Sequence, residues 1–323
     1  MRRVTLCLLM TVLAYVSNAQ QQQTWSSFYE TGFVYNPALT APWNTWEATA
    51  VVRRQWTNFE NAPESGNVSF QYPVVRRQTK LCFGGYIDYD RVGPYTRGTI
   101  AGTMAYKMRT RWFGNRDDVL SLGGKVSIEQ YRFDATRLTA FDGVLGDRNL
   151  QTVDESSVTP NISLGAYYVS VSDFYSFKSH YYFGFAANNL VPASVAVTNA
   201  GNITNTAHAN IHAGYRHFPR RSPYYIEPNI FVSYAYQQAV NVMANIRYEK
   251  VNSYWLSAGA VSNGQFFGQV GFIFNDRSFL GPLVKDGILR IGTKVDYQVA
   301  GIGEFAGIGY EAYIAYVFEN EPY

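Results

Sequence analysis

The strongest constraint on the fold of this chain is a strict alternation of apolar and polar residues over runs of about ten residues. In the clearest run, residues 205–217, one face carries Ala207, Ala209, Ile211, Ala213 and Tyr215, and the other carries Thr206, His208, Asn210, His212, Gly214 and Arg216. Successive side chains of a β-strand point to opposite faces, so this run predicts a strand with one apolar and one polar face. A run of about ten residues is also the length that a tilted strand needs to cross a bilayer.

Similar runs recur along the whole chain and are separated by short breaks rich in glycine, proline and charge. They predict about fourteen strands, an even number as expected for a single-chain barrel. The predicted strands span 45–56, 66–74, 79–90, 97–109, 118–133, 160–171, 178–190, 205–217, 224–237, 238–250, 252–263, 264–275, 287–299 and 303–318.

The charges in these runs gather on the face opposite the apolar row, where they fit a wet lumen better than the core of a soluble sandwich or propeller. The chain also combines 26 Tyr and 21 Phe with a negative mean hydropathy of −0.18. Apolar residues that face lipid and polar residues that face a lumen cancel in such an average. We therefore predict an all-β fold, an antiparallel transmembrane β-barrel of the outer membrane.

The N-terminus predicts export. Arg2 and Arg3 precede an apolar stretch from Val4 to Val16 that is too short to span a membrane, followed by small residues up to Ala19. We predict a signal peptide at 1–19, cleaved after Ala19, an N-terminal segment at 20–44 and the barrel at 45–323. The aromatic residues of the segment favour packing inside the barrel, as a plug, or across its periplasmic mouth.

Loss of the signal peptide removes two of the 27 basic residues, and the remaining basic residues are nearly balanced by the 24 acidic ones. This balance gives no reason to expect nucleic acid as a partner, because phosphate binding needs a concentrated basic surface. The expected surroundings are outer-membrane lipid.

Two long loops give the predicted barrel a direction. Residues 134–159 and 191–204 both follow odd-numbered strands, so with the N-terminus in the periplasm both loops face outward, where barrels carry their longer loops. The connection at 276–286 is an exception, an eleven-residue loop on the periplasmic side.

An adjacent arginine pair tests the assignment of faces in the first strand. Arg53 and Arg54 must point to opposite sides. The lipid-facing set is then Trp46, Ala48, Ala50, Val52, Arg54 and Trp56, and the lumen-facing set is Glu47, Thr49, Val51, Arg53 and Gln55. We expect Arg54 to extend to the headgroups beside Trp56 at the end of the strand.

The sequence predicts no catalytic, cofactor-binding or metal-binding residues. His208 and His212 lie four residues apart, which on a strand separates them by about 13 Å, too far to share one ion. The glycines near Gly301 and the Gly123–Lys125 stretch lack the rest of a nucleotide-binding motif. A hydrolase built on Ser179, His180 and Asp173 has no supporting motif. We therefore expect a non-enzymatic barrel.

Several ordered motifs resemble the PorP/SprF family of type IX secretion outer-membrane proteins. They are Asn36-Pro37-Ala38, the Arg-x-Gln-Trp motif of Arg53, Gln55 and Trp56, the turn from Phe59 to Pro63, the turn from Asp90 to Pro94, and the stretches 120–134 and 158–168. The resemblance covers essentially the whole mature chain. Thr40-Ala41-Pro42 departs from the small-residue glycine turn of many relatives.

This resemblance implies a barrel of the Bacteroidetes lineage that works with type IX secretion components. Its partner would be an adhesin-like secreted cargo protein with a C-terminal sorting domain, which it anchors or helps to export, with a link to gliding motility. We expect the outward 134–159 loop to contact cargo through Phe141, Asp142, Leu145, Asp147, Asp154 and Glu155, and the 191–204 loop to be the second candidate. The alternative function is a transport channel for small or hydrophobic solutes.

Overall fold

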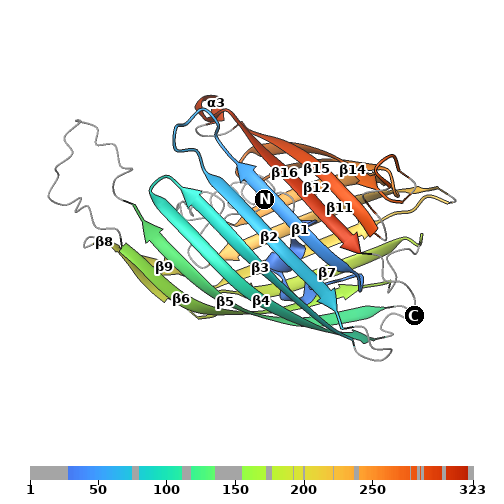
Figure 1. The fold of residues 1–323 in the computed structure, drawn as a ribbon, viewed down its shortest axis with the longest axis horizontal. Coiled ribbons are helices and arrows are strands. Elements are labelled where there is room, and N and C mark those ends of the chain that lie inside the picture. Colours follow the sequence, from blue (N-terminus) through green and yellow to red (C-terminus); the bar gives the residue numbers. More distant parts are fainter. Residues whose placement is uncertain are drawn as a thin grey trace, which may run out of the picture.

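The protein is a closed barrel of fourteen antiparallel strands (Figure 1). This confirms the predicted fold class. The computed structural model describes residues 28–74, 80–110, 118–134, 155–171, 177–191, 193–198, 201–220, 222–235, 240–276, 278–281, 284, 287–299 and 303–318.

Sequence neighbours pair around the wall, and the first and last strands close it, with Trp46 opposite Phe318 and Arg54 opposite Tyr310. The wall strands are β1 (Trp46–Arg54), β2 (Glu64–Pro73), β3 (Leu81–Val92), β4 (Tyr95–Arg109), β5 (Val119–Phe133), β6 (Glu155–Val169), β7 (His180–Asn188), β10 (His208–Arg216), β11 (Tyr224–Ala235), β12 (Asn241–Lys250), β13 (Tyr254–Val261), β14 (Gln265–Phe274), β15 (Gly287–Gln298) and β16 (Ile308–Phe318). We call the end of the barrel where β1 begins and β16 ends the terminal end. The opposite end, where β5 connects to β6 and β7 to β10, is the loop end.

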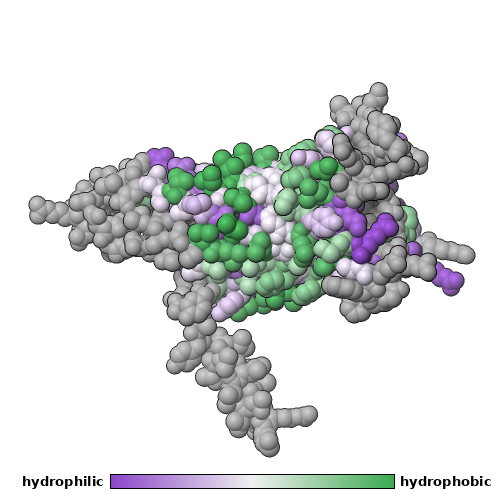
Figure 2. Space-filling model, turned by 90° about the horizontal axis from the view of Figure 1, so that it is seen from below, coloured by the Kyte–Doolittle hydropathy of each residue, from purple (hydrophilic) through white to green (hydrophobic). Residues whose placement is uncertain are grey.

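The two faces of the wall follow the alternation in the sequence. Outward side chains such as Val52, at 57% exposed, and Ile100, at 64%, alternate with buried inward ones such as Thr49 and Thr99. Figure 2 shows that the visible face is largely hydrophobic across its middle, with the most hydrophilic residues toward the ends. None of the helices among the described residues has the length and apolar character to cross a membrane.

The arginine pair lies as predicted, on opposite faces of β1. Arg53 points inward and is 4% exposed, with its guanidinium 3.8 Å from Asp296 and 3.9 Å from Glu311. Arg54 points outward at the last position of the strand and forms an ion pair with Glu64 at 3.6 Å. The prediction that Trp56 continues this strand is wrong. Trp56 has a φ of +53°, beyond the end of β1, and its ring donates a hydrogen bond to Gln298 at 3.2 Å.

Three further segments differ from the predicted pattern. β6 begins at Glu155, inside the predicted loop 134–159, because Glu155 pairs with Phe133 and extends the ladder with β5. The predicted loop 191–204 contains a hairpin of β8 (Ala193–Thr198) and β9 (Gly201–Asn205). The predicted strand 303–318 instead starts with a helical turn, α3 (Gly303–Ala306), and Gly307, with a φ of +75°, separates this turn from β16.

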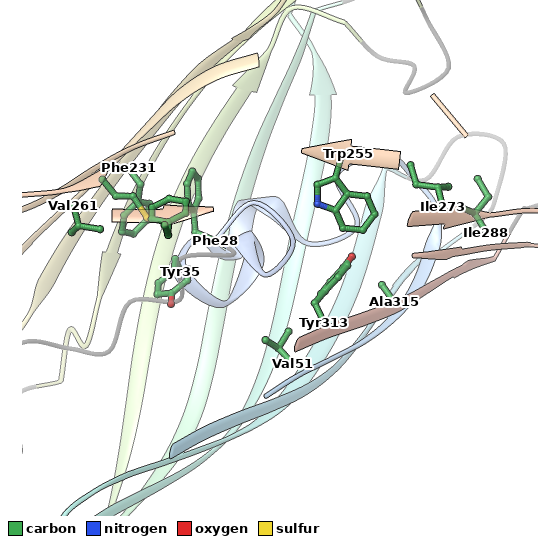
Figure 3. Packing of buried hydrophobic residues seen from close by; sticks show 12 residues of the cluster. Phe28, Tyr35, Val51, Phe231, Trp255, Val261, Ile273, Ile288, Tyr313 and Ala315 are labelled. Carbon is green, nitrogen blue, oxygen red and sulfur yellow. The ribbon is translucent and has the colours of Figure 1, made fainter. Parts of the chain in front are cut away.

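The N-terminal segment, here residues 28–45, lies inside the barrel. It contains one helical turn, α2 (Gly32–Tyr35), and a 3₁₀ turn, η1 (Pro37–Leu39). Phe28 and Tyr35 pack against Phe231 of β11, with ring centroids 5.1 and 5.3 Å from that of Phe231. Figure 3 shows these three rings on one side of the helix, and Trp255 with Tyr313, which also pack together, on the other. The apolar core is therefore formed between this segment and the inner wall.

Candidate functional site in the barrel lumen

The Asn-Pro-Ala motif forms the turn that places the N-terminal segment against the wall. Asn36 caps η1, because its side-chain oxygen accepts a hydrogen bond from the Ala38 amide at 3.0 Å and Pro37 occupies the first helical position. The Asn36 amide nitrogen donates to the carbonyl of Ala166 in β6 at 3.0 Å. Asn36 and Ala38 are fully buried. One asparagine thus ends one turn, begins the next and attaches both to the barrel.

Three inward glycines give the motif a surface without side chains to pack on. Gly123 of β5 lies directly opposite Gly165 of β6, and Gly184 follows on β7. A Cβ at Gly123 would lie 2.3 Å from the Ala38 nitrogen, one at Gly165 would lie 2.0 Å from the Asn36 side-chain oxygen, and one at Gly184 would lie 2.9 Å from the Asn36 amide nitrogen. We call these three residues the glycine platform. Only glycine allows the segment to approach this closely.

Polar side chains of the wall bind the irregular backbone of the segment. Lys125 donates to the Val34 carbonyl at 3.0 Å, and Asn188 donates to the Tyr35 carbonyl at 2.8 Å. Lys107 donates to the Ala41 carbonyl, and the side chain of Gln71 accepts from the Ala41 amide at 2.8 Å. Buried backbone groups outside regular structure need such partners. Polar residues from many strands therefore hold the segment.

Two buried ion-pair groups connect the start of the segment to the opposite wall. In the first, Arg247 pairs with Glu30 at 2.6 Å and with Glu249 at 2.7 Å, and Arg290 pairs with the same Glu249 at 2.9 Å. The second group is Arg216 with Glu227 at 2.6 Å, and Tyr29 of the segment bonds to both. Each arginine also lies over aromatic rings, for example Arg216 at 4.2 Å from the Tyr225 centroid.

The remaining motif residues meet at the loop end. The Gln55 amide donates to the Pro63 carbonyl at 2.9 Å, which closes the β1–β2 turn, and Trp56 reaches Gln298 at the end of β15. The Asn58 amide donates to the Ala306 carbonyl in α3 at 3.2 Å. The motifs at residues 36–38 and 53–63 therefore form two separate contacts, one in the lumen at residues 36–38 and one at the rim that includes Gln55, Trp56 and Pro63. Arg53 lies on the inner wall between them.

The candidate cargo residues lie almost entirely outside the described residues. Phe141, Asp142, Leu145, Asp147 and Asp154 belong to the part of the chain that is not described, and of Glu155 only the backbone, paired with Phe133, is placed. His208 and His212 both face the lumen. Within the described part of the chain, no three His, Cys, Asp and Glu side chains are grouped to hold a metal ion.

Sequence reasoning did not identify the glycine platform or the lumen ion pairs. The signal for the platform is present, because each of its glycines occupies an inward position of an alternating run. The contact of these glycines with the Asn36 turn could not be predicted from the sequence, because the two parts are far apart in it; Asn36 and its partner Ala166, for example, are 130 residues apart.

A closed antiparallel barrel with an apolar outer face and a filled polar interior defines a β-barrel protein of the outer membrane. The profile of the family described as type IX secretion system membrane protein PorP/SprF matches residues 17–316, so the chain belongs to this family. No curated protein sequence matches the chain significantly.

Solved structures with a similar fold are distant in sequence. The TodX monoaromatic hydrocarbon channel, as a deltaS2 mutant, is 9% identical, with a TM-score of 0.51 over 90% of this chain and 94% of that one. A Pseudomonas aeruginosa FadL homologue is 8% identical, with a TM-score of 0.48 over 88% and 92%. The Pseudomonas putida toluene transporter TodX is 8% identical, with a TM-score of 0.46 over 94% and 96%. At these identities the likeness concerns the fold alone.

Proposed function

We propose that this barrel is a non-enzymatic partner of the type IX secretion machinery that binds one exported cargo protein. The cargo is adhesin-like and is recognised through its C-terminal sorting domain, and the barrel anchors it at the cell surface or assists its export. Membership of the PorP/SprF family supports this function. The proposed link to gliding motility follows from the same family.

The observation that carries the proposal is the filled interior. The N-terminal segment occupies the lumen, and inward side chains such as Asn161, Ser163 and Glu227 are 0% exposed. A solute pore needs a continuous aqueous path lined by accessible side chains. An interior packed like this one favours a rigid scaffold whose ends bind other proteins.

We place the cargo-binding surface at the loop end. β5 ends and β6 begins at this end, and the β8–β9 hairpin, which follows β7 at the same end, lies beside β6 (Figure 1). Phe141 and Leu145 provide apolar contacts, and Asp142, Asp147, Asp154 and Glu155 provide charge. Aromatic and aliphatic anchors surrounded by charged residues are the usual composition of a binding surface.

Affinity isolation from outer membranes followed by mass spectrometry tests this function. The wild-type barrel should recover a protein with a C-terminal sorting domain, and the double variant Phe141→Ala/Leu145→Ala should recover at least about tenfold less, since losing two anchors costs more than 1.4 kcal/mol. The matched control is Asp276→Asn in the β14–β15 connection at the terminal end. Equal recovery by all three proteins contradicts the proposed surface.

The second candidate function is transport of small or hydrophobic solutes. Two lumen cavities of about 110 and 80 Å³ with aromatic walls favour it. Steady solute conductance by the wild-type barrel, together with normal cargo display after gene deletion, would establish transport in place of cargo binding.

A further inference from the structure

The larger of the two cavities, about 110 Å³ in volume, lies between the N-terminal segment and the wall near the terminal end. The segment contributes Glu30, Phe33 and Trp43 to its lining, and the wall contributes Glu47, Tyr225 and Tyr313. Trp43 and Glu47 are only half-buried, and both lie at the terminal end of the barrel. It is distinct from the proposed cargo surface at the loop end.

The carboxylates of this cavity exceed the cations that neutralise them. Arg247 forms ion pairs with Glu30 and Glu249, and Arg290 forms an ion pair with Glu249. Glu47 accepts a hydrogen bond from the Thr49 hydroxyl at 3.1 Å, and no lysine or arginine of the described residues lies within ion-pair distance of it. Arg290, which also lines the cavity, attracts Glu47 electrostatically but forms its ion pair with Glu249. One unpaired carboxylate therefore faces the cavity.

Glu30 is a second, independent indication that the cavity binds a cationic hydrogen-bond donor. Glu30 is 9% exposed, and its Oε1 atom accepts a hydrogen bond from Arg247 at 2.6 Å. Its Oε2 atom is buried and has no hydrogen-bond partner among the described residues. An unpaired carboxylate oxygen at a buried position is costly, and a donor entering the cavity would remove that cost.

The walls determine which kind of cation fits. Phe33, Trp43, Tyr225 and Tyr313 are aromatic and supply few oxygen ligands, whereas Ca²⁺ or Mg²⁺ requires six or more. Aromatic faces attract ammonium and guanidinium groups, and they also pack well against the alkyl stems that carry these groups. The barrel already holds its own Arg247 in this way, 4.5 Å from the Tyr29 centroid and bonded to Glu30.

We propose that this cavity binds the side chain of an arginine or lysine presented by a second polypeptide at the terminal end of the barrel. The cationic head pairs with Glu47 and with the free oxygen of Glu30, and the stem packs between the rings. If the N-terminus lies on the periplasmic side, as the sequence predicts, this polypeptide is a periplasmic one.

The test uses the purified full-length barrel in detergent and two fluorescent tripeptides, Gly-Arg-Gly and the same peptide with uncharged citrulline in place of arginine. We expect the arginine peptide to bind at least about tenfold more tightly to the wild type, and Glu47→Gln to remove this preference. The control Glu64→Gln changes a carboxylate at the loop end, which pairs with Arg91 at 2.5 Å, and should keep the preference. Folding of each variant is checked by heat-dependent gel mobility.

Equal affinity of the two peptides for the wild type overturns the proposal, and so does a preference that survives in Glu47→Gln. Free arginine that competes as strongly as the peptide overturns the assignment to a polypeptide and identifies a small guanidinium compound as the ligand. Cargo recovery by Glu47→Gln should equal that of the wild type, so this test and that of the cargo surface fail independently.

Discussion

Adding two methyl groups to the glycine platform should release the N-terminal segment while leaving the barrel folded. In Gly123→Ala/Gly165→Ala, the new Cβ atoms would lie 2.3 Å from the Ala38 nitrogen and 2.0 Å from the Asn36 side-chain oxygen. Atoms in ordinary contact are separated by at least about 3.4 Å, so the turn must move by more than 1 Å. This movement breaks the hydrogen bond from Asn36 to Ala166.

The cost can be estimated from these contacts. Overpacking of a close contact costs about 1–3 kcal/mol, and the lost hydrogen bond adds about 1 kcal/mol. Because the two sites touch the same turn, their effects do not add fully. We expect docking of the segment to weaken by about 2–4 kcal/mol, which raises its undocked population roughly 30-fold or more.

Hydrogen exchange measured by mass spectrometry on the peptide that contains residues 36–41 reports this release directly. The amides of Ala38 and Ala41 are protected by Asn36 and Gln71 and should exchange roughly 30-fold faster in the double variant. Gly124→Ala is the matched control, since this neighbouring glycine points outward and its added Cβ meets only Leu164 at 4.0 Å. Unchanged exchange in a folded double variant would refute the account of the platform.

Three further substitutions probe the motifs. Arg53→Leu should destabilise the barrel by about 3–5 kcal/mol, because it leaves the buried Asp296 and Glu311 without one of their cations. Arg54→Leu breaks a half-exposed ion pair with Glu64 and should cost less than about 1 kcal/mol. Thermal unfolding followed by gel mobility measures both, and a larger effect at Arg54 would mean that the faces are reversed. Asn36→Ala removes a cap and a wall contact and should accelerate exchange of the segment as much as the glycine variant does; an unchanged rate would show that the motif does not hold the segment.

The barrel could be predicted from sequence because its signal is local. Each strand repeats every two residues, so the opposite orientations of Arg53 and Arg54 follow from the pleat alone. The start of β6 at Glu155 was missed because pairing with β5 extends the strand into a stretch whose own pattern is weak. Trp56 continues the alternation in sequence, but its positive φ turns the chain out of the strand.

The lumen site was beyond prediction for a different reason. Several of its contacts join residues 130 or more positions apart, such as Asn36 with Ala166 and Glu30 with Arg247. The alternation of residues predicts which face of the wall a side chain lies on, but it does not predict which residue that side chain contacts across the lumen. The aromatic content of the segment indicated packing, and only the structure shows that the partners are glycines and buried arginines.

The most direct test of the central claim, that the N-terminal segment closes the barrel, is the conductance of single barrels in planar bilayers. The wild-type barrel should show no steady conductance, and a variant that lacks residues 28–44 should open a stable pore, because the side chains that fill the centre of the lumen are then gone. A wild-type barrel that conducts as well as the deletion variant would contradict this account and favour a transport channel.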